Sequence, residues 1–183
     1  MKRVAGLVAM CVLLLGVSMK AQAPEAPPKP GPEVKRLAYF VGTWKTVGKM
    51  TGMGGPDETV TSTDKTEWLP GGFFIVTHSD GMMGSTPSKE MDVQGYDPKE
   101  KAYTYHSFNN VGESVAAKGT VNGDTWLWTT DDIMMGTTPV KARVTIREVS
   151  KTQFTFKLET SPDGKAWTTG YESTSTKVMP AAK

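Results

Sequence analysis

Hydrophobic and polar side chains alternate along most of the chain, which is the pattern of β-strands that bury one face. The clearest alternation runs over 140–147, where Val, Ala, Val and Ile at even positions face Lys, Arg, Thr and Arg at odd positions. Such segments recur about every ten to twelve residues, with turn signals between them. They predict ten strands, at 43–50, 58–68, 73–80, 88–96, 102–108, 113–121, 124–130, 139–148, 152–159 and 166–177.

One short helix is expected before the first strand. Apolar residues at positions 34, 37, 38 and 41 have helical spacing, with Pro32 near the start and Gly42 at the end. No later segment keeps a period of about 3.6 residues for three turns. The pattern therefore predicts one helix followed by an all-β domain.

Short connections between the predicted strands decide how the strands can be arranged. Asn122-Gly123 and the segments 97–99 and 162–165 have the composition of hairpin turns. Strands joined in this way leave no room for crossover helices, so they form either an antiparallel up-and-down barrel or a two-sheet sandwich. Closure leaves no exposed strand edge, which favours the barrel.

The N-terminus has the pattern of a secretory signal peptide. Basic residues at positions 2 and 3 precede an uncharged apolar run over 4–17, and Ala21-Gln22-Ala23 offers a cleavage site. The run is too short to remain as a membrane span. We expect a signal peptide over 1–23, a proline-rich linker over 24–32, a barrel domain over 33–180, and a secreted or periplasmic location.

Cleavage would leave a chain with no cysteine and almost no net charge. Cys11 is the only cysteine, so the mature protein has no disulfide, thiolate metal site or cysteine nucleophile. The signal peptide also contains three of the 21 basic residues, which leaves 18 against 19 acidic residues. A near-neutral chain without a basic cluster does not indicate a nucleic-acid partner.

Residues 37–44 (LAYFVGTW) resemble the Gly-x-Trp opening of calycin barrels, the lipocalin-like fold in which a short helix closes one end. The chain also resembles the DUF1579 family of uncharacterised bacterial exported proteins, through 67–74 (EWLPGGFF), 95–98 (GYDP) and 161–165 (SPDGK). The order and spacing of these segments carry the resemblance over nearly the whole mature domain. The resemblance implies a calycin-like barrel and no particular activity.

The resemblance also implies which end of the barrel is closed. Families of this kind place an arginine of the last strand over the opening tryptophan, and the matching residues here are Lys177 and Trp44. A lysine keeps the cation–π contact but loses the planar stacking of a guanidinium group. We therefore expect a closed end at Trp44 and an open mouth at the opposite end.

Methionine and glycine are concentrated in three connections at the expected mouth: 50–55 (MTGMGG), 81–87 (GMMGSTP) and 133–139 (IMMGTTP). Their side chains could be soft apolar fillers, an adaptable lid over a small apolar ligand, or a thioether site for Cu(I). The candidate mouth residues are Met50, Met53, Met82, Met83, Met134 and Met135.

His78 and His106 are the two histidines of the chain. A lone histidine on a strand is more often an exposed or hydrogen-bonded residue than a ligand. Alternatively, one or both line the cavity and bind a metal or haem iron through imidazole, as in the haem-binding calycins called nitrobindins. A weaker metal hypothesis combines His78 with Met82 and Met134.

No catalytic pattern stands out. Asp131-Asp132 could perturb each other's pKa, but successive residues at a strand end point in opposite directions, which favours a turn role. A Gly-x-Ser-x-Gly elbow, a phosphate loop and a His-Glu-x-x-His motif are all missing from the sequence. We therefore expect a protein that is not an enzyme and whose sequence requires no cofactor.

The walls of the expected cavity bear on the kind of ligand. Trp126 or Trp128 is expected to line it, while strand 58–68 is polar on both faces and is either a solvated edge or a wet wall. The sequence thus favours a binding protein for a small apolar or amphipathic molecule. The alternatives are metal or haem binding by Met and His, and a structural module with a filled core.

Overall fold

The computed structural model of the chain describes residues 28–51, 56–130, 133–135 and 137–179. The predicted signal peptide (1–23) and residues 24–27 of the predicted linker lie outside these residues. No helix in the described ranges is long and apolar enough to cross a membrane. The elements in chain order are α1 (Pro32–Arg36), the 3₁₀ turn η1 (Leu37–Phe40), β1 (Gly42–Met50), β2 (Glu58–Trp68), β3 (Ile75–Met83), β4 (Thr86–Asp97), β5 (Ala102–Asn109), β6 (Ser114–Asn122), β7 (Thr125–Thr130), β8 (Ile133–Met135), β9 (Thr138–Ser150), β10 (Gln153–Ser161) and β11 (Thr168–Lys177).

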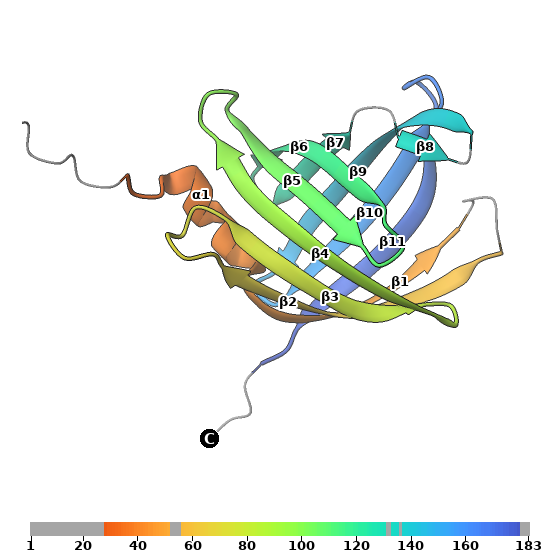
Figure 1. Cartoon of the computed structure of the whole chain (residues 1–183), viewed down its shortest axis with the longest axis horizontal. Helices are drawn as coiled ribbons and strands as arrows, with labels where there is room; N and C mark the ends of the chain where they lie inside the picture. The colour runs from red at the N-terminus through yellow and green to blue at the C-terminus, as the bar shows by residue number, and fades with distance from the viewer. Residues whose placement is uncertain (1–27, 52–55, 131–132, 136, 180–183) are drawn as a thin grey trace, which may run out of the picture.

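The strands form a closed antiparallel barrel of ten strands with one additional short strand (Figure 1). Each of β1 to β7 pairs with its neighbour in sequence, and β7 then pairs with β9. The ring closes because β10 pairs with both β9 and β11, and β11 pairs with β1. The predicted all-β, up-and-down barrel with one N-terminal helix is confirmed.

Two of the predicted mouth loops are shorter than expected. The segment 81–87 is mostly strand, since β3 runs to Met83, β4 begins at Thr86, and these two residues pair across a two-residue turn. Gly84 has φ 57° in this turn, a conformation that tight hairpins require and glycine adopts without strain. Likewise β8 pairs with the first residues of β9, so the second methionine segment also extends the sheet.

The helical segment closes one end of the barrel, which lies at the left in Figure 1. Leu37 is fully buried there, and the Phe40 ring packs against Phe154 and Trp126. The indole Nε1 of Trp44 donates a 2.7 Å hydrogen bond to the carbonyl of Phe40. These contacts join the helical segment to the first strand and to the core across the ring.

Lys177, the last residue of β11, lies at the same end of the barrel and contacts Trp44. Lys177 is paired with Trp44 in the β1–β11 ladder, and its Nζ lies 4.9 Å from the centroid of the Trp44 ring. Gly42 leaves the room for this contact, because a Cβ at Gly42 would lie 2.7 Å from Lys177 Cε. The sequence resemblance had indicated this cation over the opening tryptophan.

A charged cluster fastens α1 to the barrel wall. Arg36 Nη2 lies 2.6 Å from Glu148 Oε1, and the same carboxylate oxygen accepts a 2.7 Å hydrogen bond from Trp126 Nε1. The Arg36 guanidinium also lies 5.2 Å from the centroid of the Trp126 ring and donates to the carbonyl of Gly123. One side chain of β9 thereby positions both the helix and the most deeply buried tryptophan of β7.

Candidate functional site

The interior of the barrel contains two adjoining cavities of about 230 and 210 Å³. The first reaches the closed end, where Phe40 and Trp44 line it, and the second reaches Ile133 at the other end. Together they fall in the range of small-molecule pockets, about 300–1,000 Å³. The two cavities adjoin because they share lining residues, namely Glu90, Gln94, Tyr105, Ile146 and Phe156.

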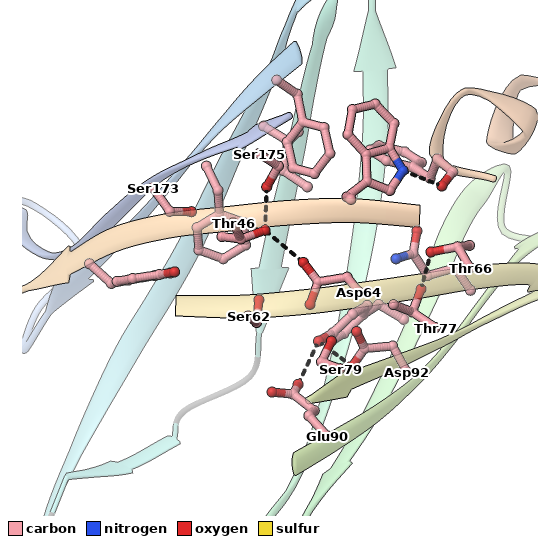
Figure 2. Close-up of a pocket in the computed structure, with 18 residues that line it drawn as sticks. Thr46, Ser62, Asp64, Thr66, Thr77, Ser79, Glu90, Asp92, Ser173 and Ser175 are labelled. Atoms are coloured by element: carbon pink, nitrogen blue, oxygen red, sulfur yellow. Dashed lines mark hydrogen bonds between the residues drawn. The ribbon is translucent and has the colours of Figure 1, made fainter. Parts of the chain in front are cut away.

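The space formed by the two cavities has a polar side and an apolar side. One wall is polar and comes from β1 to β4 and β11 (Figure 2). It consists of Thr46, Ser62, Asp64, Thr66, Thr77, Ser79, Glu90, Asp92, Gln94, Ser173 and Ser175. The other wall is mainly apolar and comes from β6, β7, β8, β9 and β10. Its apolar side chains are Val115, Ala117, Trp128, Ile133, Ala142, Val144, Ile146, Phe156 and Leu158.

Strand β4 contributes the carboxyl groups because its pairing turns an acidic face inward. In the register of the sheet, Asp92 lies between Thr77 of β3 and Ser107 of β5, both buried. Side chains alternate between the faces of a strand, so Glu90, Asp92 and Gln94 point inward while Met91 points outward. This orientation reverses the usual rule that the apolar face of a strand is buried.

Hydrogen bonds order part of the polar wall. The Thr46 hydroxyl lies 2.6 Å from Asp64 Oδ2 and 2.7 Å from the Ser175 hydroxyl (Figure 2). Because a hydroxyl group has one proton, Thr46 donates to the Asp64 carboxylate and accepts from Ser175. Across the next pair of strands, the Thr66 and Thr77 hydroxyls are 2.9 Å apart. The hydroxyl groups thus hold Asp64 in a defined orientation.

Glu90 and Asp92 meet at the phenol of Tyr105. The Tyr105 hydroxyl lies 2.8 Å from Asp92 Oδ1 and 3.1 Å from Glu90 Oε1. Burial, and then the charge of Glu90, raise the pKa of Asp92 well above its ordinary range. Burial and the two carboxyl groups raise the pKa of Tyr105 as well. One phenol proton cannot satisfy two carboxylates, so the second hydrogen bond requires a proton on one carboxyl group.

The raised pKa of Asp92 predicts how stability depends on pH. Above its ordinary value of 3.8 the unfolded chain releases this proton, while the folded chain retains it until the raised pKa is passed. The folded state then binds more protons, so stability falls as pH rises through this window. Asp92→Asn cannot ionise, and the variant is expected to be more stable than the native protein at neutral pH and equally stable below pH 3.8.

Urea denaturation at pH values on both sides of this window measures the effect. Asp80→Asn is the matched control, since Asp80 is an exposed carboxylate on the outer face of β3, paired with Lys89. The control is expected to stay within about 0.5 kcal/mol of the native protein at neutral pH. Equal stability of Asp92→Asn and the native protein across the whole pH range would contradict the prediction.

A comparison with protein-family models matches residues 29–177 to the model described as "Protein of unknown function (DUF1579)". The chain belongs to the DUF1579 family. No curated protein matches this DUF1579 chain. The match covers the whole barrel and confirms the family that the sequence motifs indicated.

Solved structures share the fold of this DUF1579 barrel at low sequence identity. Rv2717c from M. tuberculosis aligns with a TM-score of 0.57 and 9% identity, covering 82% of this chain and 100% of that protein. The S-type phycobiliprotein lyase CPES from Guillardia theta aligns with a TM-score of 0.52 and 12% identity, covering 81% and 93%. A redesigned β-barrel, mFAP0, bound to DFHBI, aligns with a TM-score of 0.42 and 14% identity, covering 76% and 99%. The first two similarities establish a shared barrel fold.

The two tryptophans expected in the cavity wall have different positions in the DUF1579 barrel. Trp128 lines the apolar cavity, and its ring packs over Gly119, where a Cβ would lie 2.5 Å from the indole. Trp126 is fully buried and lines neither cavity. Trp126 instead belongs to the core at the closed end, with Phe40 and Tyr103.

Neither histidine faces the interior. His78 is exposed on the outer face of β3, beside Met91 of β4, and His106 is exposed on the outer face of β5. Strand parity explains the difference, because the inward positions of β3 are taken by Ile75 and Thr77. The expectation that imidazole groups line the cavity is therefore corrected. The described residues also contain no cluster of three or more His, Cys, Asp or Glu side chains arranged to hold a metal.

The four candidate methionines whose side chains the structure describes do not line the cavities either. Met82 and Met134 are 38% and 63% exposed. Met50 and Met83 are half-buried near the hairpin ends of β1 and β3, and neither lines a cavity. The expectation that methionines converge over the cavity is therefore wrong for the methionines whose side chains the structure describes. The reason is that the hairpins that contain them extend beyond the closed ring of strands. Met53, the side chain of Met135, Asp131 and Asp132 lie outside the described residues.

Sequence reasoning missed the acidic face of β4. Glu90, Asp92 and Gln94 alternate with Met91 and Val93, so the pattern alone would have placed the apolar side chains inside. The available signal was the polar strand 58–68 (β2), which β3 separates from β4 and for which a wet cavity wall was one of two alternatives. The structure supports that alternative, since Ser62, Asp64 and Thr66 line the cavity.

Proposed function

We propose that this DUF1579 barrel is an exported binding protein that holds a small amphipathic molecule in its interior. The observation that carries the proposal is the pair of adjoining cavities with one polar and one apolar wall. A structural module with a filled core would not need this space, since protein interiors are close-packed.

The two walls favour an amphipathic molecule over a hydrocarbon. Carboxyl, amide and hydroxyl groups inside a barrel lose water, and this loss is unfavourable unless hydrogen bonds replace it. A purely apolar ligand would leave the groups around Asp64 and Asp92 without new partners. A molecule with one polar end can hydrogen-bond to this wall while its apolar body packs against Trp128, Val144 and Leu158.

A cavity-filling substitution tests where the ligand binds. Naphthylethanol, which has an apolar aromatic body and one hydroxyl group, serves as an amphipathic probe. Ala117 of β6 lines the apolar cavity, so Ala117→Leu is expected to weaken binding of this probe about tenfold, because the added carbons occupy ligand space. Ala116→Leu is the matched control, since the preceding residue of the same strand is exposed. Quenching of tryptophan fluorescence during titration measures both affinities.

The control variant is expected to bind like the native protein. Equal affinity of Ala117→Leu and the native protein would place the probe outside the barrel and contradict the proposal. Native mass spectrometry of the protein purified from its own host provides an independent measurement, in which we expect a small molecule bound with a stoichiometry near one.

A further inference from the structure

Among the described residues that line the two cavities, the charged side chains are all acidic. These lining residues contain three carboxyl groups, those of Asp64, Glu90 and Asp92, and no lysine, arginine or histidine. Asp64 is held by the Thr46 hydroxyl, whereas Glu90 and Asp92 share the single phenol proton of Tyr105. An anionic ligand would therefore meet like charge in a desolvated site.

A separate atom in the same wall also needs a donor. The side-chain carbonyl oxygen of Gln94, Oε1, is fully buried and accepts no hydrogen bond from any described residue. Leaving a buried acceptor unsatisfied costs about 1–3 kcal/mol, so such groups in native proteins usually mark a missing partner. Gln94 follows Asp92 on the inward face of β4 and lines both cavities. A ligand with a hydrogen-bond donor, or a water molecule, would satisfy this oxygen.

We propose that the ligand carries a cationic amine, which Glu90 and Asp92 bind as a carboxylate pair while Gln94 accepts one of its N–H groups. The inference rests on the proposed function, since it specifies the polar end of the amphipathic molecule. Glu90 lines both cavities, so an ammonium group there leaves the apolar body of the ligand against the second cavity. The ring of Trp128, centred 5.8 Å from that of Tyr105, lies on that side.

The same geometry couples binding to a proton. In the empty site one carboxyl group of the pair retains a proton, because two adjacent carboxylates repel each other. The ionisable groups that face the pair are Asp64 of β2, Tyr105 of β5 and Tyr171 of β11, and none supplies a positive charge. An ammonium group replaces the retained proton, which passes to the solvent, and the charge of the site stays balanced. Affinity for an amine therefore rises with pH until the pair is fully ionised.

Calorimetric titration with three matched probes tests the proposal on the native protein. Naphthylethylammonium, naphthylethanol and naphthylacetate share one aromatic body and differ in the charge of the polar end. We expect the ammonium probe to bind about tenfold more tightly than the alcohol, and the acetate to bind most weakly. Titrations in buffers of different ionisation enthalpy should show proton release for the ammonium probe and none for the alcohol.

A variant pair assigns the preference to the carboxyl groups. Asp92→Asn is expected to reduce affinity for the ammonium probe about tenfold and to abolish proton release, while affinity for the alcohol changes little. Asp80→Asn, on the outer face of β3, is the matched control and should retain the full preference. Circular dichroism checks that both variants are folded.

The outcomes separate this inference from the proposed function. Binding of the alcohol or acetate as tightly as the ammonium probe would overturn the cationic preference and leave a binding barrel. Failure of all three probes to bind would remove both proposals. Ammonium binding without proton release, or with unchanged affinity in Asp92→Asn, would overturn the role of the Glu90–Asp92 pair.

Discussion

Replacing Trp126 with alanine is expected to lower the free energy of unfolding by about 3–5 kcal/mol. The indole ring is fully buried, with ring centroids of Phe40 and Tyr103 at 5.2 and 4.8 Å. It also stacks at 6.2 Å on Trp128, within 6° of parallel. Truncation removes these contacts and leaves a cavity at the closed end that the rigid ring of strands cannot fill by collapsing.

Urea denaturation followed by far-ultraviolet circular dichroism measures this change. Leu127→Ala is the matched control, because the next residue of β7 points outward and is 42% exposed. The control should lose far less stability than Trp126→Ala. A similar loss in both variants would show that Trp126 is not a main contributor to the core, and that the contacts at the closed end are energetically minor.

Replacing Glu148 with alanine is expected to destabilise the protein by about 1–3 kcal/mol. The carboxylate of Glu148 is mostly buried, and it satisfies both the Trp126 indole and the Arg36 guanidinium. Alanine leaves the buried Trp126 N–H without its acceptor, and this penalty exceeds the value of an ordinary hydrogen bond. Arg36 is about a third exposed, so water replaces part of its interaction.

Glu67→Ala is the matched control for this second substitution. Glu67 is also a strand glutamate in an ion pair, with Lys65, but both side chains are 62% exposed. Surface ion pairs contribute about 0–1 kcal/mol, so the control should change stability little. Thermal denaturation of both variants under identical conditions gives the comparison, and equal shifts in Tm would refute the role assigned to burial. Glu148→Gln should recover part of the loss, since an amide oxygen can still accept from the indole.

The two stability predictions and the proposed binding site concern opposite parts of the interior. The closed end is packed with aromatic rings from η1, β1 and β7. The space beyond it contains the Asp92 carboxyl group, which reduces stability at neutral pH because its charged form is poorly solvated there. A site that reduces stability and in which no described residue donates to Gln94 Oε1 is consistent with a binding role.

The sequence by itself determined the local structure and the class of fold. Alternation with a period of two marked the strands of the ring to within a few residues, because each strand presents two faces of different polarity. Turn residues between the strands excluded crossover helices, and the need to remove exposed edges favoured closure. The segment 37–44 predicted the plug and its Trp44, since proximity along the chain brings Phe40 and Trp44 together.

Only the tertiary structure decided which side chains face the cavity. On β4 the sequence pattern favours burial of the apolar face, but the inward face is set by the register with β3 and β5 and by closure through β10 and β11. These pairings join residues far apart in the chain, so no local pattern contains them. Ring closure therefore turned Glu90 and Asp92 inward and left His78 and Met82 on the outer surface.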